Sequence, residues 1–265
     1  MAQLAYTRAG TGEPLVLLHG IGSSRQAWQP VFAALAEQFD VIAVDLPGFG
    51  DSEPLPARVE AHPAALAAKV GEFLDHLGIA APHVVGNSLG GWVALELAGV
   101  RPVASLTLLS PAGLWRGPTP RYCLFSLRAS RWFASHAGGL LSRLMAFRLG
   151  RALVLGQTHG RPFHISPDYA RAAVRAMGTC PGFHAVLRAT AKQRYRSGTP
   201  ITAPVTVAFG SRDLLLLPRQ SRHLDELPAG TRRVALPGCG HVPMADRPLE
   251  VAAAVAASTR SGRPA

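Results

Sequence analysis

The 265-residue sequence lacks any uninterrupted apolar run of the roughly 18 residues that a transmembrane helix requires. Three arginines interrupt the longest candidate, residues 140–155. The first twenty residues also lack the basic start, apolar middle and small-residue cleavage site of a signal peptide. These absences predict a cytoplasmic protein.

Cysteine is scarce. Cys123, Cys180 and Cys239 are odd in number and widely spaced, so they form neither a disulfide framework nor a metal-binding motif. The ten histidines contain no HExxH or comparable zinc pattern. We therefore expect reduced thiols, no metal and no cofactor.

Acidic residues are nearly missing from the middle of the chain. Residues 112–200 contain fourteen Arg or Lys and one acid, Asp168, whereas the remainder contains thirteen basic and fifteen acidic residues. No nucleic-acid recognition motif accompanies this charge, so nucleic acid is not an expected partner. A solvated basic surface, an anionic substrate and weak contact with an anionic membrane remain open.

Outside that segment, short apolar runs rich in Val and Leu alternate with helical patterns. One helix is predicted over 63–77, with Pro63 at its start and Gly78 just past its end. Continuous apolar runs are typical of strands buried on both faces, so the alternation predicts an α/β fold with a parallel sheet. The predicted strands are 15–18, 41–44, 83–85, 106–109, 205–209 and 233–236.

The alternation stops after residue 111 and resumes at Val205. Helical patterns fill the interval, so we predict a core of residues 1–111 and 201–265 and a helical cap of residues 112–200. Within this cap, residues 140–155 are apolar nearly all round a helix. That pattern favours a helix between core and lid that lines an acyl-sized pocket.

The sequence GNSLG, residues 86–90, lies between a predicted strand and a predicted helix. G-x-S-x-G in this context is the nucleophile elbow, in which Gly86 and Gly90 are small because the chain nearly folds onto itself. The turn lifts Ser88 above the sheet edge as a nucleophile. It also puts the amide of Leu89 at a helix N-terminus, where an oxyanion is stabilised.

A serine hydroxyl needs a base, and the base needs a carboxylate that orients it. Asp213 and His241 each follow a predicted strand, in the order Ser, acid, His expected of this architecture. A second oxyanion donor is expected from the glycine-rich loop after strand 15–18, where Gly20 precedes the amide of Ile21.

Together with DLPGFGDS at 45–52, these motifs make the chain resemble the α/β-hydrolase superfamily. The resemblance covers nearly everything outside residues 112–200. It implies an eight-stranded, mostly parallel sheet, with a helical cap between strands six and seven. A serine at the elbow argues against haloalkane dehalogenases and epoxide hydrolases, which resemble this pattern but carry Asp there.

The expected activity is hydrolysis of a carboxylic ester or thioester with a hydrophobic acyl group. The alternative is a carbon–carbon bond hydrolase of aromatic ring-cleavage products, whose elbow GNSLGG is similar. Those enzymes usually carry Trp after the catalytic His, where this sequence has Val242. A non-enzymatic binding protein on the same fold is a third reading. The sequence makes no prediction of oligomeric state.

Overall fold

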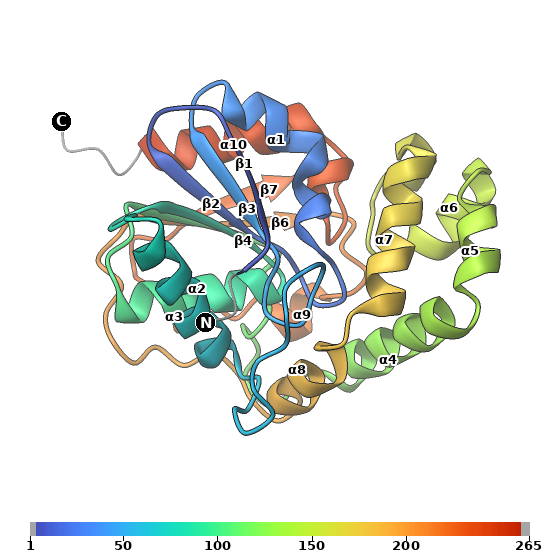
Figure 1. Ribbon diagram of the computed structural model, residues 1–265, viewed down its shortest axis with the longest axis horizontal. Coiled ribbons are helices and arrows are strands. Elements are labelled where there is room, and N and C mark those ends of the chain that lie inside the picture. Colours follow the sequence, from blue (N-terminus) through green and yellow to red (C-terminus); the bar gives the residue numbers. More distant parts are fainter. Residues whose placement is uncertain (1–3, 261–265) are drawn as a thin grey trace.

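The computed structural model describes residues 4–260, and a seven-stranded sheet forms its centre (Figure 1). Residues 1–3 and 261–265, the two ends of the predicted core, lie outside the described part. The strand order is β1-β3-β2-β4-β5-β6-β7, in which β1 pairs antiparallel with β3 and the other pairs are parallel. The strands are β1 (Tyr6–Ala9), β2 (Pro14–Leu18), β3 (Asp40–Val44), β4 (His83–Asn87), β5 (Ser105–Leu109), β6 (Val205–Gly210) and β7 (Arg232–Leu236).

Helices cover both faces of the sheet (Figure 1). Successive side chains of a strand point to opposite faces, so Leu15 and Leu17 pack with α1 and α10, while Val16 and Leu18 pack with α2 and α3. Both faces of the central strands are therefore buried, as predicted. The core helices are α1 (Gln29–Ala36), α2 (Pro63–His76), α3 (Leu89–Val100), α9 (Pro218–Ser221) and α10 (Pro248–Arg260), with short 3-10 helices η1 (Arg25–Trp28) and η3 (Pro243–Ala245).

The two edge strands differ from this pattern. Of β7 only Leu236 is buried, so the prediction that residues 233–236 are covered on both faces is wrong. All four residues of β1 are exposed, and their mixed polar and apolar sequence, YTRA, explains why no strand was predicted there. An edge strand has a neighbouring strand on one side alone, and here helices cover it incompletely: Tyr6 of β1 contacts Phe73 of α2 and is still exposed.

The predicted count of eight strands is also wrong for the described residues, which form seven. Six apolar runs were found in the sequence; the higher count came from the resemblance alone. The amino-terminal part of the described chain contributes β1 and then turns directly into β2 through Gly10 and Gly12, both at positive φ. The helical insertion accordingly lies between the fifth and sixth strands, β5 and β6.

The insertion is helical between β5 and β6. Side chains of α4 and α8, including Leu127 and Val186, join the core that covers the α2–α3 face of the sheet. Helices α5, α6 and α7 share a small separate core around Met145, Tyr169 and Val174. The inserted elements are α4 (Arg121–His136), α5 (Gly138–Leu144), α6 (Arg148–Leu155), η2 (Pro162–His164), α7 (Pro167–Thr179) and α8 (Phe183–Thr190).

The single helix expected over 140–155 is instead two helices, α5 and α6, with a break at residues 145–147. Buried Arg151 explains the break, because its guanidinium donates to the carbonyls of Met145 (2.7 Å) and Ala146 (3.2 Å) at the end of α5. Carbonyls left without partners at a helix end are thereby satisfied. Within residues 4–260, no helix has the length and apolar character needed to cross a bilayer.

Candidate active site

Ser88 connects β4 to α3 and adopts φ +54°, a backbone conformation that is uncommon for a residue with a side chain. The surrounding backbone holds it there. Its amide donates to the Leu109 carbonyl (3.1 Å), and its own carbonyl accepts from the amides of Gly91 and Ala112 (3.0 and 2.9 Å). Such strain persists where the neighbouring structure fixes it, and it is concentrated at functional sites.

The glycines around Ser88 are required by close contacts between backbones. A Cβ at Gly86 would lie 2.2 Å from the Gly90 carbonyl oxygen, and one at Gly90 would lie 2.1 Å from that of Leu18. A Cβ at Gly20 would lie 3.2 Å from Cβ of Ser88. The elbow and the loop after β2 are thus packed directly against each other.

The strand order explains why these two segments meet. Strand β2 is the parallel neighbour of β4, so the loop carrying Ile21 leaves the same edge of the sheet as Ser88. Ile21, Ser88 and Leu89 line one pocket. Leu89 is the first residue of α3, so its amide N–H has no intrahelical acceptor and is available to an anion.

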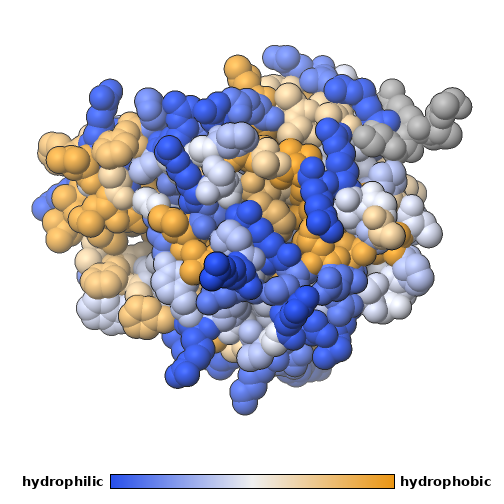
Figure 2. Space-filling view, turned by 180° about the vertical axis from the view of Figure 1, so that it is seen from behind, coloured by the Kyte–Doolittle hydropathy of each residue, from blue (hydrophilic) through white to orange (hydrophobic). Residues whose placement is uncertain are grey.

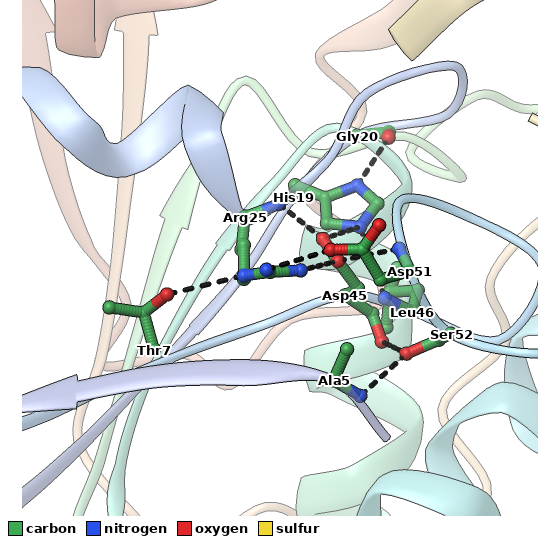
Figure 3. A network of polar contacts seen from close by, with 9 residues as sticks. All are labelled: Ala5, Thr7, His19, Gly20, Arg25, Asp45, Leu46, Asp51 and Ser52. Carbon is green, nitrogen blue, oxygen red and sulfur yellow. Dashed lines mark hydrogen bonds and ion pairs between the residues drawn. The ribbon is translucent and has the colours of Figure 1, made fainter. Parts of the chain in front are cut away.

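His19 fixes the start of this loop (Figure 3). Its Nε2 accepts from the Leu46 amide (3.0 Å), so Nδ1 carries the proton and donates to the Gly20 carbonyl (2.8 Å). Burial lowers the pKa of His19, against the attraction of Asp45. The imidazole is therefore neutral near pH 7 and holds Gly20 beside Ser88.

Asp45 lies at the centre of the same network and is fully buried (Figure 3). Its carboxylate accepts from the Arg25 amide (2.6 Å), the Asp51 amide (2.9 Å) and the Arg25 guanidinium. Arg25 also pairs with the exposed carboxylate of Asp51 (2.8 Å). The DLPGFGDS segment thus holds loops together, and Asp45 does not line the pocket.

Asp213 and His241 meet at the same edge, in the loops after β6 and β7. His241 Nδ1 lies 2.9 Å from Asp213 Oδ2, and Asp213 Oδ1 accepts from the amides of Leu215 (3.0 Å) and Leu216 (2.8 Å). Burial alone would raise the pKa of Asp213, but its interaction with His241 and the two amide hydrogen bonds together lower it. The carboxylate is accordingly ionised at neutral pH.

Asn87 links the His241 loop to the elbow. Its side-chain amide donates to the carbonyls of Leu109 (3.0 Å) and His241 (2.9 Å), which joins β4, β5 and the loop after β7. His241 Nε2 is buried and has no hydrogen-bond partner among the described residues, so no bond joins it to Ser88 in this structure. Asn87 was missed in the sequence because it occupies a variable position of the G-x-S-x-G motif.

Asp246 connects the same loop to the insertion. Its carboxylate accepts from the amides of Gly240 (2.7 Å), Gly160 (2.8 Å) and Arg161 (2.8 Å). His159, buried beside it, carries an Nε2 without a partner among residues 4–260. Sequence reasoning missed Asp246, because an Asp two residues before Pro248 reads as an ordinary helix start.

The pocket at Ser88 is lined by apolar and uncharged polar side chains, none of them charged. Residues 138–155 contribute nothing to it, so the predicted acyl-lining role of residues 140–155 is wrong; α4 and α8 take that place. Burial, with a contribution from the Asp213 charge, raises the pKa of the lining thiol of Cys123 to about 12, so this thiol does not compete as a nucleophile. The insertion supplies Ala112, Trp115, Thr119, Cys123, Leu127, Val186, Leu187 and Thr190.

The described residues contain no group of three or more His, Cys, Asp or Glu side chains placed to hold a metal ion. All three cysteines are buried and free. The groups gathered at this edge are instead a hydroxyl, an imidazole–carboxylate pair and backbone amides. Such a set is suited to attack on a carbonyl carbon and stabilisation of the resulting oxyanion.

The profile of the alpha/beta hydrolase family matches residues 15–254, and the chain belongs to this family. The fold is the α/β-hydrolase fold, and the family supports hydrolase activity.

Curated relatives span several activities. The pimeloyl-[acyl-carrier protein] methyl ester esterase of Aeromonas hydrophila is 30% identical over 252 residues, covering 92% of this chain and 94% of that protein. Epoxide hydrolase EphH of Mycobacterium tuberculosis is 33% identical, covering 70% of this chain and 89% of its own. A dihydrolipoyllysine-residue acetyltransferase component of the acetoin cleaving system from Pseudomonas putida is 43% identical over 113 residues, but this chain spans 30% of its length.

Among solved structures, a thermophilic esterase from Thermogutta terrifontis aligns with a TM-score of 0.78 at 23% identity, over 98% of this chain and 94% of that one. At this identity the similarity establishes the fold. The particular bond that is cleaved must be argued from the site itself.

Proposed function

We propose that this protein is a serine hydrolase that cleaves a carboxylic ester or thioester with a hydrophobic acyl group. The observation that supports it best is the uncharged pocket in which Ser88 lies beside Ile21 and Leu89. A pocket of this kind holds an apolar chain and presents its carbonyl to the hydroxyl. The proposal rests on this geometry, since the relatives differ in activity.

In the proposed mechanism His241 Nε2 accepts the proton of the Ser88 hydroxyl as its oxygen attacks the carbonyl carbon. The amides of Ile21 and Leu89 donate to the oxyanion. His241 then gives the proton to the leaving alcohol or thiol, which leaves an acyl-Ser88 ester. His241 then takes a proton from water as the water oxygen attacks this ester. The bond between the acyl carbon and Ser88 Oγ breaks, the acid is released, and His241 returns the proton to Ser88.

Asp213 holds the imidazole by its Nδ1, so that Nε2 is the basic nitrogen, and stabilises the imidazolium. The lowered pKa of Asp213 keeps its carboxylate charged while His241 accepts and releases protons during the reaction. His241 Nε2 has no hydrogen-bond partner among the described residues, and this supports the assignment. Leaving a buried polar atom unpaired costs free energy, and a catalytic role is one reason for a protein to retain such an atom. Catalytic hydrogen bonds in free enzymes are often formed only with substrate.

We further propose that residues 112–200 act as a cap that selects the acyl group, with 1–111 and 201–265 as the catalytic core. Carbon–carbon bond hydrolysis ranks second. Its ring-cleavage substrates carry a carboxylate, and no arginine of the insertion lines the pocket to receive it. An anionic acyl carrier would have to be recognised outside the pocket for the same reason.

The decisive experiment measures kcat/KM for aryl esters of increasing acyl length, beside a thioester and a ring-cleavage dienoate. We expect a rise with acyl length and little turnover of the dienoate. Ser88→Ala should lower kcat by about 10⁴-fold or more with an unchanged melting temperature. A fluorophosphonate probe should label the wild type and not this variant. Equal turnover by both proteins, or failure to label the wild type, would refute the proposal.

A further inference from the structure

The outer face of α4 carries aromatic side chains that are exposed in the described structure. Tyr122, Phe125, Trp132 and Phe133 are all exposed, with Phe125 72% exposed. Tyr122, Trp132 and Phe133 are three, seven and eight residues from Phe125, which places all four on one stripe of a helix with 3.6 residues per turn. The opposite side of α4 supplies Cys123 to the pocket, so this helix is apolar on two faces.

Exposed apolar side chains also lie on α6, where Leu149 and Leu153 are four residues apart on one face. Just past the end of α6, the Gln157 amide donates to Tyr122 Oη (2.9 Å), and Tyr122 Oη donates to the carbonyl of Leu214 (3.0 Å), the residue after Asp213. These bonds join the start of α4 to the end of α6 and to the loop of the proposed catalytic acid.

We call this surface the apolar face. Nine of the fourteen large apolar side chains exposed in residues 4–260 come from residues 122–163. Figure 2 shows hydrophobic side chains gathered on the side of the molecule where α5 and α6 lie, with hydrophilic ones beside them. A patch of this kind on a soluble fold marks an interaction surface. Its residues are Tyr122, Phe125, Trp132, Phe133, Leu140, Phe147, Leu149 and Leu153.

Cations lie on the helices that carry the apolar face. Arg121 and Arg128 lie along one side of the aromatic stripe on α4, Arg143 lies on α5, and Arg148 is the first residue of α6. All four arginines are exposed. The single acid of the insertion, Asp168, is paired with Arg171 (2.9 Å). The surface thus combines apolar side chains with uncompensated positive charge.

We propose that the apolar face docks onto the surface of an anionic phospholipid bilayer. Aromatic and leucine side chains are stabilised at the boundary between headgroups and acyl chains, while arginine extends its charge to the phosphates. A second copy of this chain is a poorer occupant, because it would bring two strongly basic insertions together. The charge complementarity favours lipid.

Docking would have a consequence for the site that rests on the proposed function. Because α4 carries the aromatic stripe and also lines the pocket, a docked molecule holds its acyl pocket close to the lipid surface. A substrate dissolved in the bilayer is then presented locally, without first entering water. The docking itself does not depend on the chemistry at Ser88.

Tryptophan fluorescence offers a direct test, since Trp28, Trp92 and Trp115 are buried and Trp132 is exposed. Vesicles of phosphatidylglycerol and phosphatidylcholine in equal parts should shift emission to the blue and sediment the protein. Phosphatidylcholine vesicles should bind it about tenfold less, because the anionic headgroups supply part of the attraction. Added salt should weaken binding to the anionic vesicles. Trp132→Phe should abolish the shift and retain sedimentation.

The double variant Phe125→Ser with Leu153→Ser should bind anionic vesicles at least about tenfold less tightly than wild type. Val100→Ser with Leu249→Ser is the matched control, since these side chains are 75% and 76% exposed and lie on α3 and α10, outside the apolar face. The control should bind like wild type. Both variants should hydrolyse a short soluble ester normally, which separates a failure of docking from a failure of the hydrolase assignment.

Three results would overturn the docking proposal. Wild-type protein that stays in the supernatant with anionic vesicles would do so. Equal vesicle binding by the two double variants would show that the apolar face is not the contact. Sedimentation velocity that reveals a dimer, dissociated by Phe125→Ser with Leu153→Ser, together with absent vesicle binding, would assign the face to a second copy.

Discussion

Close contacts at single residues determine which substitutions the elbow around Ser88 tolerates. Ser88 and the glycines around it were identified from a five-residue pattern, because a turn this tight restricts residue size before any tertiary contact is considered. What the pattern could not reveal is the identity of the opposing atoms. The Leu18 carbonyl beside Gly90 belongs to a residue 72 positions earlier in the chain, and Asn87 acts through its side chain at a position where the motif specifies no residue type.

A pair of glycines in α3 tests this at the residue scale. Gly90→Ala places a Cβ 2.1 Å from a backbone oxygen, so we expect a loss of about 3 kcal/mol in the free energy of unfolding and loss of activity. Gly99→Ala, in the same helix with nothing within 4 Å of its Cβ, should instead gain about 0.5 kcal/mol. Urea denaturation of both variants measures the difference, and equal stabilities would contradict the assigned contact.

At the scale of elements, the positions of the central strands along the chain were predictable from apolar runs, but the exposure of the edge strands was not. β1 was missed and β7 was taken as buried, since exposure depends on which strands lie at the ends of the sheet. The prediction of a single helix over 140–155 was wrong. Arg151 is buried and donates to the carbonyls of Met145 and Ala146, between α5 and α6. Hydrophobic periodicity contains no information about such a bond.

The loops after β2 and β3 are joined by the ion pair of buried Asp45 with partly exposed Arg25, and two aspartate variants test its contribution. Asp45→Asn leaves Arg25 without its buried counter-charge, so we expect a loss of about 3 kcal/mol in unfolding free energy and a fall in kcat as the Ile21 loop loosens. Asp51→Asn, which removes an exposed partner of the same arginine, should cost about 0.5 kcal/mol or less. Thermal and chemical denaturation with ester assays distinguish the two variants. Equal losses of unfolding free energy in the two variants would show that Asp45 contributes no more to stability than exposed Asp51.

At the scale of the whole molecule, the concentration of positive charge in residues 112–200 was evident from the sequence, while its arrangement was not. Four exposed arginines, Arg121, Arg128, Arg143 and Arg148, lie on the helices that carry the apolar face, and no arginine lines the pocket. The sequence could not separate these outcomes, because charge counts do not say which side of a helix faces outward. The site roles of Ser88, Asp213 and His241 remain predictions, now with a stated geometry.

His159 lies in the segment whose backbone bonds the His241 loop, through Thr158 and Gly160, and it makes the stability of the molecule sensitive to acid. Burial lowers the pKa of His159 to about 4, against the opposing pull of Asp246. The unfolded chain, with an ordinary histidine pKa near 6.5, then binds more protons, so stability is complete above that pH and falls as the pH drops toward 4. Protonation of His159 should lower the free energy of unfolding by about 3 kcal/mol over this pH range.

His159→Gln should remove much of this loss, whereas His164→Gln, at an exposed position of the same segment, should leave it unchanged. Melting temperatures between pH 7 and pH 4 measure the effect. An identical acid dependence in wild type and His159→Gln would exclude this histidine as its source.

The chain leaves the sheet at β5 and re-enters at β6, which is the strand hydrogen-bonded directly to it. A segment that departs from and returns to adjoining positions can be exchanged without reordering the strands. The groups that we propose to break the bond, Ser88, Asp213 and His241, all lie outside that excursion, next to strands of the sheet. Related chains can therefore change the substrates that they accept by replacing the segment between these two strands. Grafting the corresponding segment of another chain between β5 and β6 should alter substrate selectivity and leave the cleavage step intact.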